Sequence, residues 1–355
     1  MNAASNPQYA LDLKIDQGRL ATVLRRCILE CTSELCSDLV PDSVSVEIIP
    51  QRHYLANSNH FECLVWGHTD LGQPVQHCMH AKRSRFAEIE YANLVWLWEG
   101  HRFADSINRI PRPLACWVEY HLLLTESISD QTALLPWIVR FASPLGMYAD
   151  RQSARMRMQR LADWLVAFQQ GTFSVRWARS PAHLDDIDEA LHALTAIPDL
   201  SSKDRRHMVD WLSSARSNMQ SVSPVLSHGD FTARNILMDQ VSVTVVDWEK
   251  PLLGRHPLYD VQAFLVNLER RLSFPLCRRH AVQELKDAFL ARFIARVPFE
   301  VDEQALTVSR VVVLIHELKA EHRALQDHRI QAVLRRRQSF MRYLLAEIKR
   351  ETGIG

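Results

Sequence analysis

Two oxygen-bearing side chains in the second half of the chain are spaced so that a β-hairpin would bring them together. A polar turn at 239–242 separates two short apolar runs, which predicts a pair of antiparallel strands. Pairing of Ile236 with Val246 would place Asn235 and Asp247 side by side at the open end of this hairpin. A carboxylate and a carboxamide oxygen are ligands that a hard cation such as magnesium accepts.

Two further acidic residues flank this pair. Asp230 comes five residues before Asn235, on a loop where it can face an incoming substrate hydroxyl, and Glu249 adds a second carboxylate beyond Asp247. In phosphoryl transfer the protein mainly positions groups and neutralises charge, so an acid beside metal-bound phosphates is sufficient as the base. The spacing therefore predicts magnesium-dependent phosphoryl transfer with Asp230 as the base. His228 is expected to hold the loop by hydrogen bonding.

The composition excludes several other classes of protein. The 42 Lys and Arg residues balance 41 Asp and Glu residues, so no global charge favours a nucleic-acid partner. Charged residues interrupt every apolar run before it could form a signal peptide or a membrane span. The seven cysteines are odd in number and never spaced as Cys-x-x-Cys, which favours a reduced, cytoplasmic protein.

A chain of 355 residues exceeds the usual size of a single core, so two lobes are expected. We predict an N-terminal helical extension at 1–40, a β-rich nucleotide-binding lobe at 41–126, and a helical catalytic and acceptor-binding lobe at 127–355. The expected elements of the first two segments are a helix over about 17–38, strands at Val44–Ile49, Phe61–Trp66, Val75–Ala81, Ala115–Val118 and Tyr120–Thr125, and a helix from Phe86 to Trp98. The fold class is therefore α+β, with a small antiparallel lobe carrying one helix and a larger, mainly helical lobe.

The catalytic segment resembles a known family. The matching motifs are His228-Gly229-Asp230-Phe231-Thr232-Ala233-Arg234-Asn235 and Val245-Val246-Asp247-Trp248-Glu249. They are similar to those of the aminoglycoside phosphotransferase and choline kinase group, which implies a two-lobed protein-kinase-like fold with ATP and magnesium as cofactors. The resemblance implies Asp230 as catalytic base, Asn235 and Asp247 as magnesium ligands, and Glu249 as an auxiliary acid.

The same resemblance extends to the β-rich lobe. It implies that Lys82 contacts the α- and β-phosphates and that Glu90 is its helix partner, although both could instead be solvated surface charges. The loop at 56–60 contains no glycine where many kinases cover the phosphates with a Gly-rich loop. Ser58 and Asn59 could still cradle phosphate there, or the loop could be an ordinary polar turn.

Other motifs bear on the substrate. Gly229 replaces the Arg of regulated protein kinases, and Asp247-Trp248-Glu249 replaces Asp-Phe-Gly, which favours a small-molecule kinase. A helical excursion at about 184–220 could form an acceptor pocket. Short strings also resemble the lipopolysaccharide-core sugar kinases, namely Glu90-Tyr91-Ala92-Asn93-Leu94, Pro111-Arg112-Pro113-Leu114-Ala115 and Leu123-Leu124-Thr125-Glu126. This similarity implies a sugar or glycolipid sugar hydroxyl as acceptor, with Glu126 in an adenine-contacting segment, 125–127.

Three alternatives stay open at the level of sequence. The glycine-free loop is also compatible with a pseudokinase-type nucleotide-binding or regulatory module without turnover. Asp260 is interpreted as a helix N-cap rather than as an element beside the site. The C-terminal helix surrounds an apolar face with basic residues, which indicates core packing with a solvated rim or peripheral contact with an anionic membrane. The oligomeric state is not encoded in any of these patterns.

Overall fold

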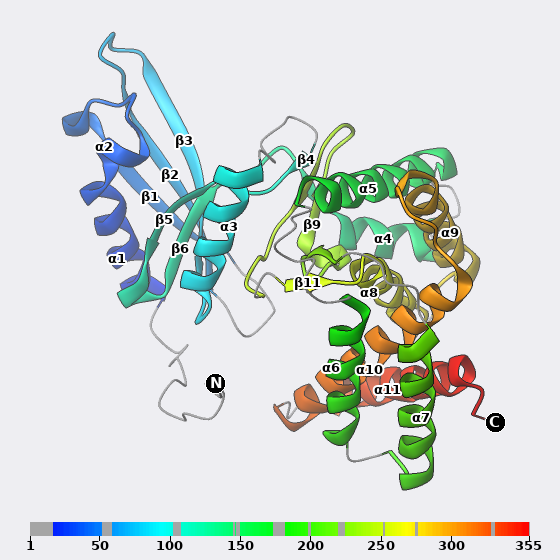
Figure 1. Cartoon of the computed structure of the whole chain (residues 1–355). Helices are drawn as coiled ribbons and strands as arrows, with labels where there is room; N and C mark the ends of the chain where they lie inside the picture. The colour runs from blue at the N-terminus through cyan, green and yellow to red at the C-terminus, as the bar shows by residue number, and fades with distance from the viewer. Residues whose placement is uncertain are drawn as a thin grey trace. The chain divides into compact units, whose positions relative to one another are not determined.

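The computed structural model divides by packing into two compact units (Figure 1). It describes residues 17–51, 59–101, 108–144, 146, 150–172, 182–197, 200–218, 224–250, 253–273, 276–327 and 331–354. Unit 1 comprises residues 1–104, 110–130 and 247–249, and unit 2 comprises residues 105–109, 131–246 and 250–355. The segment boundaries expected after residues 40 and 126 stay predictions.

Unit 1 is built on an antiparallel sheet with strand order β1-β2-β3-β6-β5. Its helices are α1 (Gln17–Glu30), α2 (Thr32–Leu35) and α3 (Ala87–His101); its strands are β1 (Ser45–Gln51), β2 (Asn59–His68), β3 (Pro74–Arg83), β5 (Pro113–Trp117) and β6 (Leu122–Glu126); and 3-10 helices cover Pro41–Ser43 and Val118–Tyr120. Every strand predicted in this lobe overlaps one of these strands, and the helix predicted from Phe86 to Trp98 overlaps α3. The expected α+β class is confirmed.

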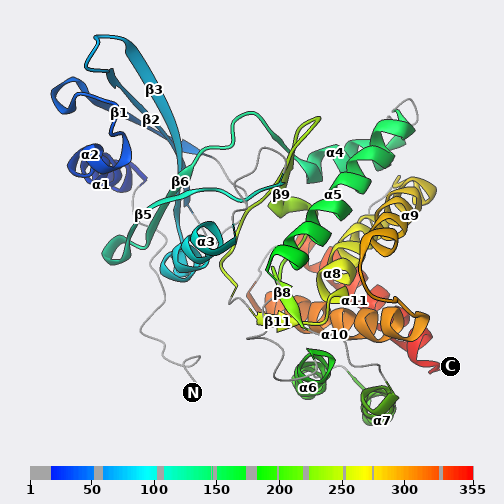
Figure 2. The same cartoon turned by 45° about the horizontal axis from the view of Figure 1, so that its top comes forward.

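The alternation of side chains along each strand separates two faces of this sheet. Phe61, Cys63 and Ala81 are buried on one face, where they pack with Leu24 and Ile28 of α1 in a single apolar core. α3 packs beside β5 and β6. Figures 1 and 2 show α1 and α3 on opposite sides of the sheet.

The helix predicted over 17–38 is interrupted. α1 ends at Glu30, and the short α2 follows as a separate turn. The Thr32 hydroxyl donates to the carbonyl of Ile28 at 3.0 Å and to that of Leu29 at 3.1 Å. Such side-chain bonds compete with the helical backbone pattern, so the apolar spacing alone does not locate this boundary.

Unit 2 is mainly helical. Its helices are α4 (Leu134–Ala142), α5 (Arg151–Gly171), α6 (Ala182–Thr195), α7 (Ser202–Asn218), α8 (Leu258–Glu269), α9 (Arg279–Arg296), α10 (Glu303–Asp327) and α11 (Gln331–Thr352). Short strands form two small sheets, ordered β4-β10-β9-β7 and β11-β8, with β4 (Asn108–Arg109), β7 (Thr132–Ala133), β8 (Val225–Ser227), β9 (Ile236–Met238), β10 (Val243–Val245) and β11 (Leu253–Arg255). The predicted excursion at 184–220 consists of α6 and α7, which lie side by side in Figures 1 and 2.

Buried aromatic rings connect these helices to the segment after β8. Phe231 stacks on Trp164 of α5, with ring centroids 5.8 Å apart, and contacts Phe264 of α8 at 5.9 Å. Phe264 in turn contacts Phe289 of α9 at 4.7 Å. Because aromatic pairs at these separations are favourable and their burial is large, the core holds the backbone on either side of Phe231.

An ionic network ties α8, α9, α10 and α11 together. The Glu269 carboxylate is 2% exposed and accepts hydrogen bonds from Lys286, from Tyr343 at 2.8 Å, and from Arg310 at 2.9 and 3.0 Å. Burial alone would raise the pKa of Glu269, but the bonds and charges of Arg310 and Lys286 hold it below its ordinary value. The folded state therefore favours the charged form of Glu269.

Replacement of Glu269 is expected to give a pH-dependent loss of stability. A depressed folded pKa contributes stability that is present above the unfolded value of about 4.5 and is lost as the pH falls through the folded pKa. Glu269→Gln should cost about 3 kcal/mol at pH 7, because it leaves buried cations without their partner. Urea unfolding at pH 7 and pH 4 measures the difference from wild type, which should shrink at the lower pH. Glu300→Gln, an exposed control, should have little effect at either pH.

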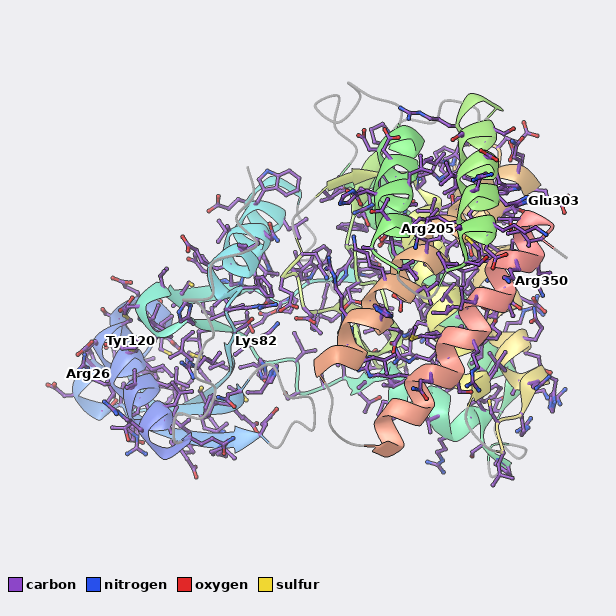
Figure 3. The ribbon with its side chains drawn as sticks, turned by 90° about the horizontal axis from the view of Figure 1, so that it is seen from below. Arg26, Lys82, Tyr120, Arg205, Glu303 and Arg350 are labelled. Carbon is purple, nitrogen blue, oxygen red and sulfur yellow. The ribbon has the colours of Figure 1, made fainter. Side chains whose placement is uncertain are left out.

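The basic residues of α11 are partly engaged within unit 2. Arg337 pairs with Glu321 at 2.8 Å, and Lys349 pairs with Asp204 at 2.9 Å. Arg350, labelled in Figure 3, pairs with Glu347 at 2.7 Å. These pairs support core packing with a charged rim as the role of this helix.

The thiols and the helices bear on two expectations from composition. All seven cysteines lie within the described residues, and none of them is joined in a disulfide. None of the helices in the described ranges is long and apolar enough to cross a membrane.

Candidate active site

The loop that carries Asp230 is held at its start by a buried carboxylate of α8. Asp260 is 1% exposed and accepts hydrogen bonds from the Ser227 hydroxyl at 2.9 Å and from the backbone N–H groups of His228 at 2.8 Å and Gly229 at 3.1 Å. The interpretation of Asp260 as an N-cap is wrong, because Pro257 occupies the cap position and Asp260 lies inside the helix. The sequence signal was an acid in the first turn of a helix, which does not reveal a distant backbone partner.

Removal of the Asp260 carboxylate should destabilise the protein. Asp260→Ala would leave the His228 N–H and the Ser227 hydroxyl without their acceptor, whereas the Gly229 N–H keeps its second acceptor, the Ser227 hydroxyl oxygen, at 3.0 Å. Each buried unsatisfied donor costs about 1–3 kcal/mol, so we expect a loss of at least about 2 kcal/mol in the free energy of unfolding, measured with urea. Asp260→Asn keeps one acceptor oxygen and should lose less. Wild-type stability in the alanine variant would contradict the role of Asp260 as an anchor.

The backbone of this loop takes a conformation that suits glycine and is fixed by an imidazole. Gly229 has φ +75°, a region that side chains other than glycine rarely adopt. The N–H of Asp230 donates to Nδ1 of His228 at 3.2 Å, and Nε2 of His228 lies 3.1 Å from the carbonyl oxygen of Val246. Because Nδ1 accepts, Nε2 carries the proton that is donated to Val246. The expected structural role of His228 is confirmed.

The Asp230 carboxylate is oriented by two neighbours. Its Oδ2 accepts hydrogen bonds from Arg234 at 2.9 Å and from the amide nitrogen of Asn235 at 3.0 Å, and its side chain stays 20% exposed. The same Asn235 nitrogen donates to the carbonyl of Asp230 at 3.0 Å. With its nitrogen engaged in this way, Asn235 presents its amide oxygen as the atom for a cation.

The hairpin exists, but its register differs from the predicted one. Ile236 pairs with Val245 rather than with Val246, and the N–H of Val246 donates to the carbonyl of Asn235 at 2.9 Å. Asn235 is therefore opposite Val246, and Asp247 is the next residue along the chain. The apolar run 243–246 predicted the strand but could not specify its register, because either pairing keeps apolar side chains together.

In unit 1 the structure brings together four of the predicted residues. Lys82 lies on β3, which is labelled in Figure 1, and the residue itself is labelled in Figure 3. Its ammonium pairs with Glu90 of α3 at 2.8 Å, with Asp247, and with Glu249 at 3.5 Å. Oxygen atoms of the three carboxylates lie within 4.8 Å of one another. Burial alone would lower the pKa of Lys82, but these three carboxylates outweigh it and raise the pKa above its ordinary value.

The charge of this cluster fits a divalent cation. Three carboxylates surround one ammonium, and burial raises the pKa of Glu90, with the charge of Lys82 opposing and that of Asp247 adding to the effect. Carboxylate oxygens are the donors that magnesium prefers, and a bound cation would offset the excess negative charge. The donor set is therefore suitable for magnesium beside the lysine that is expected to contact phosphate.

Hydrogen bonds between the backbone of Trp248 and side chains of α3 anchor the segment 247–249. The N–H of Trp248 donates to Glu90 at 3.2 Å, and the side chain of Asn93 donates to the Trp248 carbonyl at 2.7 Å. Asp247 has φ +72°, an uncommon conformation for a residue other than glycine and one found more often for Asp and Asn. Sequence analysis missed Asn93 as an anchor, although it follows Glu90 by three residues and so shares its helix face.

The structure describes two of the remaining three residues that are predicted to contact the nucleotide. Ser58 lies outside the described residues. The buried amide nitrogen of Asn59 has no hydrogen-bond partner within the described ranges. The N–H of Glu126 donates to Arg112 at 3.0 Å, and that of Ser127 donates to Cys78 at 3.2 Å, so backbone bonds hold the expected adenine-contacting segment at the edge of β3.

Comparison with known families gives one match over the catalytic segment. The model of the phosphotransferase enzyme family matches residues 109–296, which is 188 of the 355 residues. No curated protein sequence matches the chain.

Solved structures of kinases share the fold at low sequence identity. Choline kinase LicA from Streptococcus pneumoniae is 13% identical with a TM-score of 0.56, and the match covers 94% of this chain and 99% of that one. A thermostable mutant of aminoglycoside phosphotransferase APH(4)-Ia in a ternary complex with ADP and hygromycin B is 15% identical, with a TM-score of 0.54 and coverage of 88% and 96%. A glucosamine kinase in complex with glucosamine, ADP and inorganic phosphate is 13% identical, with a TM-score of 0.50 and coverage of 87% and 80%. The expected kinase-like fold is confirmed.

Proposed function

The chain belongs to the phosphotransferase enzyme family, whose members phosphorylate hydroxyl-bearing small molecules, and we propose that it transfers the γ-phosphoryl group of ATP to a hydroxyl of a sugar or glycolipid sugar. Asp230 accepts the proton of the acceptor hydroxyl as its oxygen bonds to the γ-phosphorus. The bond between the γ-phosphorus and the β-phosphate oxygen breaks, and ADP leaves.

The observation that carries this proposal is the hydrogen-bonded pair of Asp230 and Asn235. Asn235 uses its nitrogen to orient the Asp230 carboxylate, while Oδ1 of Asp230 has no hydrogen-bond donor among the described residues. A base with one free oxygen next to an amide oxygen suited to magnesium is the arrangement that phosphoryl transfer needs.

Asn235 and Asp247 are proposed to share the magnesium ion, with Glu249 as an auxiliary acid. The support is their proximity along the chain, since Val246 is bonded to the backbone of Asn235 and directly precedes Asp247. Bound magnesium would neutralise charge on the phosphates, and Lys82, held by Glu90, would contact the α- and β-phosphates. Ser58, Asn59 and Glu126 remain proposed nucleotide contacts.

The surroundings of Asp230 favour an acceptor that also carries a positive charge. Burial and then the charge of Asp230 raise the pKa of Glu317 on α10, although the charges of Arg270 and Arg234 oppose the increase, so the charge of Asp230 disfavours a second negative charge on Glu317. A protonated amine on the acceptor would relieve this repulsion and bring its hydroxyl toward Asp230. Within the proposed sugars, an amino sugar matches this electrostatic environment.

A panel of acceptors tests the function. ATP consumption with magnesium would be measured against amino sugars, neutral sugars, lipid-linked sugars, amino alcohols and aminoglycosides. We expect turnover with a sugar acceptor, strongest for one that carries an amine. Turnover with amino alcohols alone would overturn the sugar assignment, whereas ATP binding without turnover on any acceptor would favour the nucleotide-binding module. We place the reaction in the cytoplasm, where ATP is available and free thiols persist.

A further inference from the structure

A groove in unit 2 lies between four helices. It has a volume of about 470 Å³ and is lined by residues of α8, α9, α10 and α11. Gln262, Leu265 and Glu269 of α8 are its buried residues, whereas Asp287 of α9 and Arg350 of α11, labelled in Figure 3, are exposed at its rim. Sites for small molecules usually measure about 300–1,000 Å³, so the groove is large enough to hold one.

Helix α8 separates this groove from the catalytic loop. Asp260 and Asn267 share one face of the helix and hold the loop there, since they accept hydrogen bonds from the N–H groups of His228 at 2.8 Å and Ala233 at 3.4 Å. With 3.6 residues per turn, the groove-lining positions 262, 265 and 269 lie on the opposite face. The groove is therefore distinct from the place where the proposed acceptor meets the catalytic base.

The charges beside the groove are paired with one another. Three cations and three carboxylates form one network, namely Lys286, Arg310 and Arg350 with Glu269, Glu347 and Glu351. Arg310 alone contacts all three carboxylates, at 2.9, 2.8 and 3.2 Å. The network has no net charge, and the further carboxylate of Asp287 is exposed at the rim, where solvent and salt screen it. A charged ligand would thus find no unpaired opposite charge inside the groove, which favours a neutral one.

The groove also offers hydrogen-bonding atoms of both kinds. The Lys286 ammonium has three donors, and Glu269 is its one partner in the described part of the chain. The amide oxygen of Gln262 is buried and has no donor among the described residues, and the half-buried Thr307 adds a hydroxyl to the lining. An unsatisfied buried acceptor is costly, and a hydroxyl on a ligand would supply the missing donor. Because hydroxyls both donate and accept, a ligand with several of them suits this set of atoms.

We propose that this groove is a second ligand site, separate from the catalytic centre, and that it binds a neutral sugar. The sugar hydroxyls bond to Lys286, Thr307 and Gln262, and the C–H groups of the ring pack on the leucines of the lining. The two sites then differ in the charge that they select, since the surroundings of Asp230 favour an amine and the groove favours an uncharged ring. The site does not depend on the proposed reaction.

NMR titrations with the methyl glycosides of glucose, galactose and mannose test this site. At least one glycoside should bind the wild-type protein at millimolar concentration. Thr307→Trp fills the groove and leaves the ionic network intact, so it should weaken that binding by at least about tenfold. Gln304→Trp is the matched control, because Gln304 is exposed on the same helix and does not line the groove, and its affinity should equal that of wild type.

A smaller change and two charged ligands test the chemistry of the groove. Gln262→Leu keeps the size of the side chain but deletes its amide, and should weaken glycoside binding by about fivefold to tenfold. Glucosamine and glucuronate should lose the contribution of the groove, so that Thr307→Trp leaves their affinities unchanged. The melting temperature of each variant verifies that its fold is retained.

Three outcomes would overturn this inference. They are the absence of binding by all three glycosides, glycoside binding that neither Thr307→Trp nor Gln262→Leu weakens, and a loss of charged-sugar affinity in Thr307→Trp as large as that of the neutral glycosides. The second outcome would assign the glycoside to the acceptor site and would support the proposed function. Failure of the proposed function is seen separately, as the absence of turnover with the panel of acceptors.

Discussion

Asp230→Asn is expected to lower kcat by at least about a hundredfold while the KM for ATP stays near that of wild type. The carboxylate is proposed to accept the acceptor proton, and removal of a general base costs about 10²–10⁴ in rate. Asparagine preserves the shape of the side chain and keeps an oxygen that can accept the bonds from Arg234 and Asn235. The rate is measured by coupled ADP release with the best acceptor from the panel.

The matched control for this variant is Asp210→Asn. Asp210 is an exposed carboxylate of α7 in the same unit, and its loss should leave kcat unchanged. The melting temperature of each variant verifies that the fold is retained. Full activity in Asp230→Asn would exclude this residue as the base and would require another acceptor for the hydroxyl proton.

Asp247→Asn is expected to abolish the magnesium dependence of ATP binding. The wild-type protein should be stabilised by ATP far more with magnesium than without it, because a ligand bound only by the folded state raises its stability. Removal of the Asp247 carboxylate deletes one oxygen donor and one charge from the cluster around Lys82. Thermal shifts with ATP, with and without magnesium, measure this effect, and kcat/KM should fall by at least about a hundredfold.

The choice of asparagine follows from the backbone at this position. Asp247 has φ +72°, which Asn adopts more readily than Ala, so the substitution removes the charge with little added strain. Asp70→Asn, an exposed residue of the same unit, is the control and should respond to ATP and magnesium like wild type. An unaltered magnesium effect in Asp247→Asn would show that the metal is bound without this carboxylate.

The strands and helices of the β-rich unit were predictable because their apolar patterns are strong and local. Phe61–Trp66 and Val75–Ala81 alternate around buried positions, and each lies within the strand found there. The pairing of Lys82 with Glu90 was also expected, but from a family resemblance rather than from periodicity. The structure adds the contacts of Lys82 with Asp247 and Glu249.

Features that depend on tertiary partners were not predictable. A change of one residue in the register of the hairpin moves Asn235 from Asp247 to Val246, and both pairings fit the same apolar run. Asp260 has the composition of a cap but bonds to backbone groups more than thirty residues away. His60 and His80 are separated by twenty residues, and only the register of β2 and β3 brings their rings together.

The packing of α1 on the sheet has a practical consequence for the design of expression variants. A shortened protein that starts at Pro41 would retain every strand of the sheet but would uncover Phe61, Cys63 and Val65, which are fully buried now. A contiguous apolar patch of this kind promotes self-association. Affinity tags and fusion partners should therefore precede residue 17, and loss of α1 should appear as aggregation during purification before any change in catalysis can be measured.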